Sequence, residues 1–84
     1  LLFLYARHFE MLGKLTAFVR NIRKEQVELT SCPDVIEVLS RDNFKMIHAI
    51  EAQTQNRITL VGDSHLHVEE VRLKRVLDKR KRLW

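Results

Sequence analysis

The chain has 84 residues, 15 Lys and Arg against 11 Asp and Glu, and a formal net charge of +4. A hydrophobic fraction of 45% excludes the low-hydrophobicity composition of disordered proteins, and the length allows a single small domain, 1–84, without a large enzyme cleft. The single cysteine, Cys32, excludes an internal disulfide framework and a cysteine-based zinc site.

Residues 1–26 are predicted to form one long amphipathic helix. Apolar side chains recur at steps of three and four residues, while polar side chains fall mostly on the opposite side. The apolar face carries large residues that a core of this size would not cover alone, which indicates a surface for a protein partner or a homodimer. The candidate interface residues are Leu1, Leu4, Tyr5, Phe9 and Phe18, together with Trp84 at the far end of the chain.

The apolar start of this helix, LLFLYA, is followed directly by Arg7, His8 and Glu10. Because a membrane-spanning helix needs about 20 mostly apolar residues, we expect no membrane span within this chain, although a missing upstream segment could extend the stretch. The chain begins with Leu1 rather than Met, so we expect a processed product or part of a longer protein. The absence of a recognisable secretory signal and of paired cysteines favours an intracellular or organellar setting.

Two short helices and two strands are predicted between residues 27 and 68. Residues 27–32 alternate between apolar and polar, as in a short strand or an extended connector. Pro33 and Asp34 suit the first turn of a helix over 33–39, the stretch 40–43 interrupts it, and a second helix follows over 43–54. The β-branched run at 57–61 predicts a strand, and the alternation at 65–68, after a turn at 62–64, predicts another.

The chain from Glu69 to Trp84 is predicted to be a basic helix, with acidic residues in its first turn and cations at its end. Residues 71–84 contain seven cations and one acid, Asp78, a local charge of +6 that leaves −2 for the rest of the chain. Such a field attracts phosphate backbones; the alternatives are a solvated helix end and a surface for an acidic protein or a membrane. The candidate nucleic-acid contacts on this helix are Arg72, Lys74, Arg75, Lys79, Arg80, Lys81 and Arg82.

No constellation of residues indicates catalysis. Cys32 lacks the flanking residues typical of a nucleophile and is interpreted as a small buried side chain. His65 and His67 would share one side of a strand, but two imidazoles are too few for a stable zinc site. The only glycines, Gly13 and Gly62, form no phosphate-binding loop. We therefore expect no enzymatic activity, no metal and no cofactor.

The run from Val35 to Leu60 resembles the core of a KH domain. In that family a short helix leads into a glycine loop, followed by a second helix of the form I-x-x-I-x-x-x-T-G-x-x-I and a strand. Gln55 stands in the usual glycine place of this pattern. The residues that fit the register are Ile47, Ile50, Thr54 and Ile58.

This resemblance implies a small α+β domain in which residues 27–84 form a KH-like core that binds nucleic acid. The GXXG loop of the family is absent, with SRDN or RDNF in its place. Glycine lets a nucleic-acid backbone approach closely, and Asp42 would repel a phosphate, so binding through the usual groove is not expected. Arg41 and Lys45 flank this loop and, with Arg57, form a secondary basic patch.

Two hypotheses from different classes follow. The first is a non-enzymatic nucleic-acid-binding module, RNA rather than DNA, that contacts phosphates through a basic C-terminal helix and is suited to a ribonucleoprotein. The second is a helical protein–protein interaction or scaffold subunit that uses the apolar face of residues 1–26. The expected fold is α+β with two or three short strands, and the alternative is an all-α bundle of three or four helices.

Overall fold

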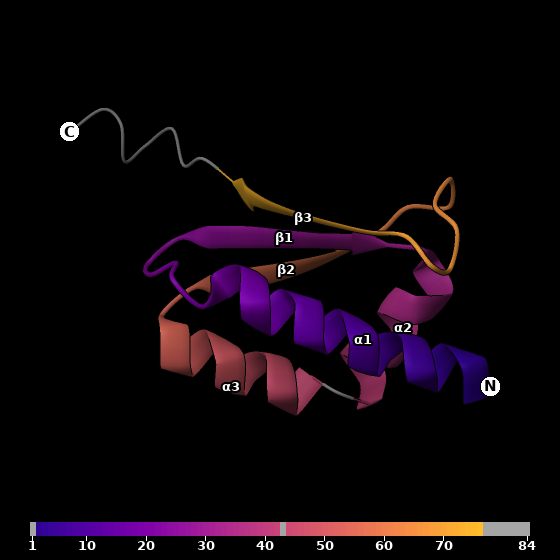
Figure 1. The fold of residues 1–84 in the computed structure, drawn as a ribbon, viewed down its shortest axis with the longest axis horizontal. Helices are drawn as coiled ribbons and strands as arrows, with labels where there is room; N and C mark the ends of the chain where they lie inside the picture. Colours follow the sequence, from indigo (N-terminus) through magenta and orange to yellow (C-terminus); the bar gives the residue numbers. More distant parts are fainter. Residues whose placement is uncertain (1, 43, 77–84) are drawn as a thin grey trace.

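Residues that alternate between apolar and polar pair as strands, and the helical segments pack on one side of them. The structure, a computed structural model, describes residues 2–42 and 44–76, with side chains over 9–41 and 44–76. The elements are α1 (Leu2–Val19), β1 (Gln26–Ser31), α2 (Pro33–Asp42), α3 (Phe44–Thr54), β2 (Arg57–Gly62) and β3 (Val71–Val76) (Figure 1). The fold is therefore α+β and not an all-α bundle.

The strand β1 is the centre of a mixed three-stranded sheet with the order β2-β1-β3. It runs parallel to β2 and antiparallel to β3, with Val27 opposite Ile58 on one side and opposite Arg75 on the other. The helices α2 and α3 together form the crossover that parallel strands require. All three helices lie on one side of the sheet (Figure 1). The other side is left uncovered by the described elements.

The core lies between the sheet and the helices. Every second residue of β1, Val27, Leu29 and Ser31, is buried toward the helices, as the period of a strand dictates. The second half of α1 packs in the same core as the βααβ segment that follows it. The buried core consists of Met11, Leu12, Leu15, Val19, Val27, Leu29, Cys32, Val35, Leu39, Ile47 and Ile58.

The helix α1 ends at Val19 rather than continuing to residue 26 as predicted. The N–H groups of Arg20 and Ile22 donate to carbonyls three residues earlier, which tightens the last turn. Lys24 then adopts a left-handed backbone conformation with φ of 57°, which a right-handed helix cannot contain. The guanidinium of Arg23 donates to the carbonyls of Arg20 and Ile22 at 2.9 and 2.8 Å and so caps the helix end.

The middle of the chain follows the predicted pattern closely. The strands predicted at 27–32 and 57–61 and the helix predicted at 43–54 are confirmed to within one residue at each end. The predicted break at 40–43 is shorter, because α2 continues to Asp42 and α3 begins at Phe44. The hydroxyl of Ser40 donates to the carbonyl of Glu37 at 3.2 Å, and Arg41 pairs with the Glu37 carboxylate at 3.3 Å. These contacts within the helix support the extra turn.

The strand predicted at 65–68 is wrong, since residues 63–70 form turns. The carboxylate of Asp63 accepts the backbone N–H of His65 at 2.9 Å. The carboxylate of Glu70 accepts the N–H of His67 at 3.1 Å. Side chains therefore satisfy backbone donors locally, and the segment does not need a strand partner.

The helix predicted from Glu69 is also wrong over 71–76, where the chain forms β3. Val71 and Leu73 are two residues apart and lie opposite the buried Ser31 and Leu29 of β1. Pairing with the second edge of β1 thus buries both apolar side chains partly and supplies a ladder of hydrogen bonds. Residues 77–84, where the predicted helix would continue, lie outside the described residues.

The loop after α1 and the turn after α3 are held together by Asn56, whose side chain is almost fully buried at 4% exposure. Its amide donates to the carbonyl of Ile22 at 2.8 Å and accepts the N–H of Glu25 at 3.1 Å. The carbonyl of Glu25 in turn accepts the N–H of Arg57 at 2.8 Å. This junction brings the starts of β1 and β2 together.

Replacement of Asn56 by Ala is expected to lower the free energy of unfolding by about 1–3 kcal/mol, because a partly buried carbonyl and a partly buried N–H each lose a partner. The measurement is urea denaturation followed by circular dichroism. The matched control is Gln53→Ala, which removes an exposed amide one turn earlier and should change stability by less than about 0.5 kcal/mol. Equal effects of the two substitutions would contradict the assigned role of Asn56.

Gln55, which directly follows α3, has a left-handed backbone with φ of 58°. Glycine adopts this conformation without the penalty that a Cβ atom imposes, so Gln55→Gly is expected to raise the free energy of unfolding by about 0.5–1 kcal/mol. Ala52→Gly, inside the same helix, should instead lower it by about 1 kcal/mol. The measurement is thermal melting of both variants. If Gln55→Gly lowers the stability as Ala52→Gly does, the left-handed backbone at residue 55 does not favour glycine.

Candidate nucleic-acid interface

The uncovered face of the sheet carries the side chains that alternate with the core residues. On β1 these are Gln26, Glu28 and Thr30, the half-exposed positions between the buried ones. The register places residues of β2 and β3 beside each of them in three cross-strand rows. The rows are Arg57–Gln26–Val76, Thr59–Glu28–Lys74 and Val61–Thr30–Arg72. We call these nine residues the open face.

Three cations lie on the open face: Arg57 on β2, and Arg72 and Lys74 on β3. All three are exposed. The ammonium of Lys74 lies 3.5 Å from the carboxylate of Glu28, the only acidic residue among the nine. Within the part of the chain that the structure describes, Arg57 and Arg72 form no ion pair. The open face thus has a charge of +2, and neither of its arginines forms an ion pair with another described residue that an anion would have to break.

Arg75, predicted as a nucleic-acid contact, occupies a different position from its neighbours on β3. It lies opposite Val27, so its side chain belongs to the helix side of the sheet. Its guanidinium binds the carboxylate of Glu25 through two nitrogens, with Nε 3.0 Å from Oε1. A bidentate pair of this kind joins the end of β3 to the loop before β1. The structure therefore gives Arg75 a structural partner and removes it from the open face.

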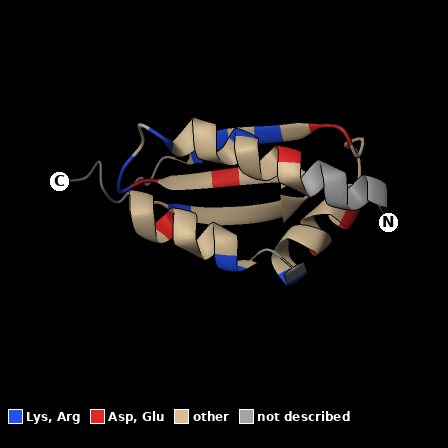
Figure 2. Ribbon diagram, turned by 60° about the horizontal axis from the view of Figure 1, so that its bottom comes forward, with Lys and Arg blue, Asp and Glu red and all other residues tan. Residues whose placement is uncertain are grey.

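The other predicted cations are not brought to the open face. Arg41 lies at the end of α2 and Lys45 at the start of α3. Figure 2 shows blue segments where these two helices meet, away from the sheet. The guanidinium of Arg41 is 3.3 Å from the carboxylate of Glu37. The predicted contacts Lys79, Arg80, Lys81 and Arg82 lie outside the described residues.

The predicted partner surface on α1 is described only in part. Phe9 is 64% exposed, whereas Phe18 is half-buried and packs against the core. Exposed apolar side chains also occur on α3, at Phe44 and Met46. Leu1, the side chains of Leu4 and Tyr5, and Trp84 lie outside the described side chains.

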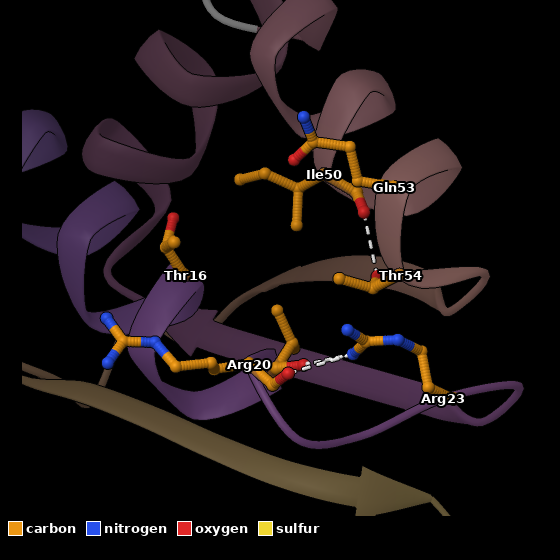
Figure 3. A pocket seen from close by; sticks show the side chains of 7 residues that line it. Thr16, Arg20, Arg23, Ile50, Gln53 and Thr54 are labelled. Atoms are coloured by element: carbon orange, nitrogen blue, oxygen red, sulfur yellow. Dashed lines mark hydrogen bonds between the residues drawn. The ribbon is translucent and has the colours of Figure 1, made fainter.

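A pocket of about 200 Å³ lies between the C-terminal turn of α1 and α3. Its apolar lining comes from Val19 and Ile50, and its rim includes Arg20 and Arg23 (Figure 3). Figure 3 shows the Arg23 guanidinium turned toward the end of α1, where it caps carbonyls. The Arg20 guanidinium extends away from it, and the two arginines do not converge on one point. The two arginines therefore do not form a shared site for one anion in this pocket.

The described residues contain neither a group of metal-ligating side chains nor a helix that could span a membrane. Over 2–42 and 44–76, no three His, Cys, Asp or Glu side chains are grouped as metal ligands. Cys32 is buried in the core and has no ionisable partner among the contacts that the structure shows. Of the helices described, none has the length and apolarity to cross a bilayer.

The residues that sequence reasoning missed are the polar ones of the open face, Gln26, Thr30 and Thr59. Their amide and hydroxyl groups stand between the three cations and can donate to or accept from a ligand. The alternation of 26–31 and 57–62 shows which residues of each strand share a face. It does not show that β3 adds Arg72 and Lys74 to the same face, because that requires the pairing register.

Comparison with the profiles of known protein families gives no match to this chain, and a search of curated proteins gives none either.

The turn after β2 contains a carboxylate whose ionisation stabilises the fold. The backbone N–H of His65 donates to Asp63, and this hydrogen bond, together with the side chain of His65 and the charge of Arg72, lowers the pKa of Asp63 below its ordinary 3.8. Ionised Asp63 therefore stabilises the folded state above pH 3.8, and the contribution is lost as the pH falls through the lowered pKa.

Asp63→Asn is expected to be less stable than the natural chain at pH 7. The difference should shrink below pH 3.8 and disappear once Asp63 is protonated in the folded state too. Chemical denaturation at a series of pH values measures it. A difference of the same size from pH 7 to pH 2 would show that the charge of Asp63 is not what stabilises the turn.

Proposed function

We propose that this domain is a non-enzymatic nucleic-acid-binding module that binds single-stranded RNA through the open face of its sheet. The observation that carries the proposal is the position of Arg57, Arg72 and Lys74, three exposed cations on the face that no described helix covers. They come from both edge strands and flank the polar residues of β1. The phosphates of a nucleic-acid strand that crosses the sheet would therefore lie near cations of both edge strands.

The dimensions of the sheet suit an extended strand of nucleic acid. Neighbouring strands lie about 4.8 Å apart and each residue advances about 3.3 Å along a strand, so the backbone positions of Arg57 and Lys74 are separated by roughly 12 Å and those of Arg57 and Arg72 by roughly 16 Å, diagonally across β1. Phosphates would bind at Arg57 and Arg72, and the hydroxyl and amide groups of Thr59, Thr30 and Gln26 would contact sugars and base edges.

The chemistry of the open face supports binding with little sequence preference. Aromatic side chains, on which bases stack, do not occur among its nine residues. Affinity would then come mainly from phosphate contacts and the release of counterions, which makes it steeply dependent on salt. Lys79, Arg80, Lys81 and Arg82 follow β3 in the sequence and would add to the same field.

The test is fluorescence anisotropy of a labelled 15-nucleotide oligouridine over a series of salt concentrations. Each phosphate contact contributes about 0.7 to the slope of log affinity against log salt for a single strand. The variant Arg57→Ala, Arg72→Ala, Lys74→Ala should therefore lose about 2 from this slope. The matched control, Lys14→Ala, Arg20→Ala, Lys45→Ala, removes three exposed cations from the helical layer and should leave the slope nearly unchanged.

A further variant with Lys79, Arg80, Lys81 and Arg82 changed to Ala separates the C-terminal cations from the open face. A flatter slope in this variant and an unchanged slope in the open-face variant would move the binding site to the C-terminal run. Equal losses in the open-face and helical-layer variants would show that only net charge matters. No binding at low salt by folded protein would overturn the nucleic-acid function.

A further inference from the structure

The outer edge of β3 presents a row of backbone groups that have no partner among the described residues. The ladder between β1 and β2 begins with the Arg57 N–H on the Glu25 carbonyl, so the odd-numbered residues of β1 direct their backbone toward β2. The even-numbered ones therefore bond β3, through Arg72, Lys74 and Val76. It follows that the N–H and C=O groups of Val71, Leu73 and Arg75 point away from the sheet.

The opposite edge of the sheet, on β2, differs because a side chain binds one of its outward backbone groups. There the outward N–H of Ile58 donates to the carboxylate of Glu51 on α3 at 2.7 Å. Glu51 is held in turn by His48, whose Nδ1 lies 3.2 Å away. At the other end of β2, a Cβ atom on Gly62 would come within 3.3 Å of the Pro33 backbone, so α2 begins close over the helix-facing side of β2. Within the described residues, the edge of β2 thus has an outward N–H that a side chain binds, whereas the edge of β3 has none.

The charges of β3 decide which strand can add to that edge. Arg72 and Lys74 project on the open face, where every second side chain of an added strand would lie beside them. A second copy of β3 would bring cations against cations, and like charges on neighbouring strands destabilise the pair. An acidic strand would instead form cross-strand ion pairs. The same cations therefore exclude self-association and select an acidic partner.

The other face of β3 adds a second requirement. Val71 and Leu73 are only half-buried, so apolar surface remains at this margin of the core. A strand added here would place its alternate side chains next to them. We propose that β3 accepts an extended peptide of alternating acidic and apolar residues as a fourth strand, with the acidic side chains beside Arg72 and Lys74. The peptide belongs to a protein partner and extends the sheet by backbone hydrogen bonds.

The test uses a blocked eight-residue peptide of alternating Glu and Val, and a peptide of alternating Lys and Val as its control. The readout is amide hydrogen exchange by NMR of the full chain. In the free protein the amides of Val71, Leu73 and Arg75 should exchange faster than those of Arg72 and Lys74. The Glu peptide should slow the first set about tenfold or more, and the Lys peptide should not.

A pair of variants at one position separates backbone pairing from charge. Arg75→Pro removes an outward N–H, whereas Arg75→Ala keeps it, and both lose the ion pair with Glu25. Proline is tolerated on an edge strand where its nitrogen faces solvent. The proline variant should bind the Glu peptide about fivefold or more weakly than the alanine variant, since one backbone hydrogen bond is lost.

Three results would overturn the proposal: binding of the Glu peptide without protection of the outward amides, equal affinity of the proline and alanine variants, or equal binding of the Lys peptide. Oligouridine binding by the Arg75→Pro variant is measured in parallel. Since Arg75 is not on the open face, RNA binding should persist in this variant. A loss of peptide binding with RNA binding intact also shows that the variant is folded, so the two proposals can fail independently.

Discussion

The amide of Asn56 and the backbone of Glu25 form the junction on which the register of the sheet depends. Glu25 is held at three places: its N–H by Asn56, its carbonyl by the N–H of Arg57, and its carboxylate by Arg75. These three partners come from the α3–β2 turn, from β2 and from β3. The starts of β1 and β2 and the end of β3 are thereby aligned at one end of the sheet. A strand that slips by one residue turns every side chain to the other face, so this alignment determines what is buried.

The position of the candidate interface follows from the same alignment. With Glu25 held, Val27 and Leu29 face the helices, and Glu28 and Thr30 face solvent. The paired residues of β3 are then assigned as well: Arg75 belongs with Val27 on the helix side, and Lys74 with Glu28 on the open face. Neighbouring cations in the sequence thus have different roles. Arg75 closes the junction, whereas Arg72 and Lys74 lie on the open face, where we propose that they bind RNA.

The parts of the fold that local patterns determine could be predicted, and the parts that pairing determines could not. The β-branched run at 57–61 and the Pro33–Asp34 helix start act within a few residues and are confirmed. The segment VRLKRV fits two structures, because Val71 and Leu73 suit a strand while Leu73 and Val76 suit a helix. Pairing with β1 decides between them, and that interaction joins residues about 45 positions apart. For the candidate interface, Arg57 was identified only as a secondary patch, since its closeness to Arg72 and Lys74 depends on the same pairing.

The proposed RNA surface and the proposed strand edge share two side chains, and this makes them competitors rather than independent sites. Arg72 and Lys74 stand on the open face beside the outer margin of the sheet. An acidic strand added to that margin would pair its carboxylates with them and leave Arg57 as the only unneutralised cation of the face. The open face would then lose most of the positive charge that attracts phosphates. By reciprocity, bound RNA would weaken the binding of the added acidic strand. A protein partner of this chemistry would therefore displace RNA without covering the centre of the open face, through the charges of β3 alone.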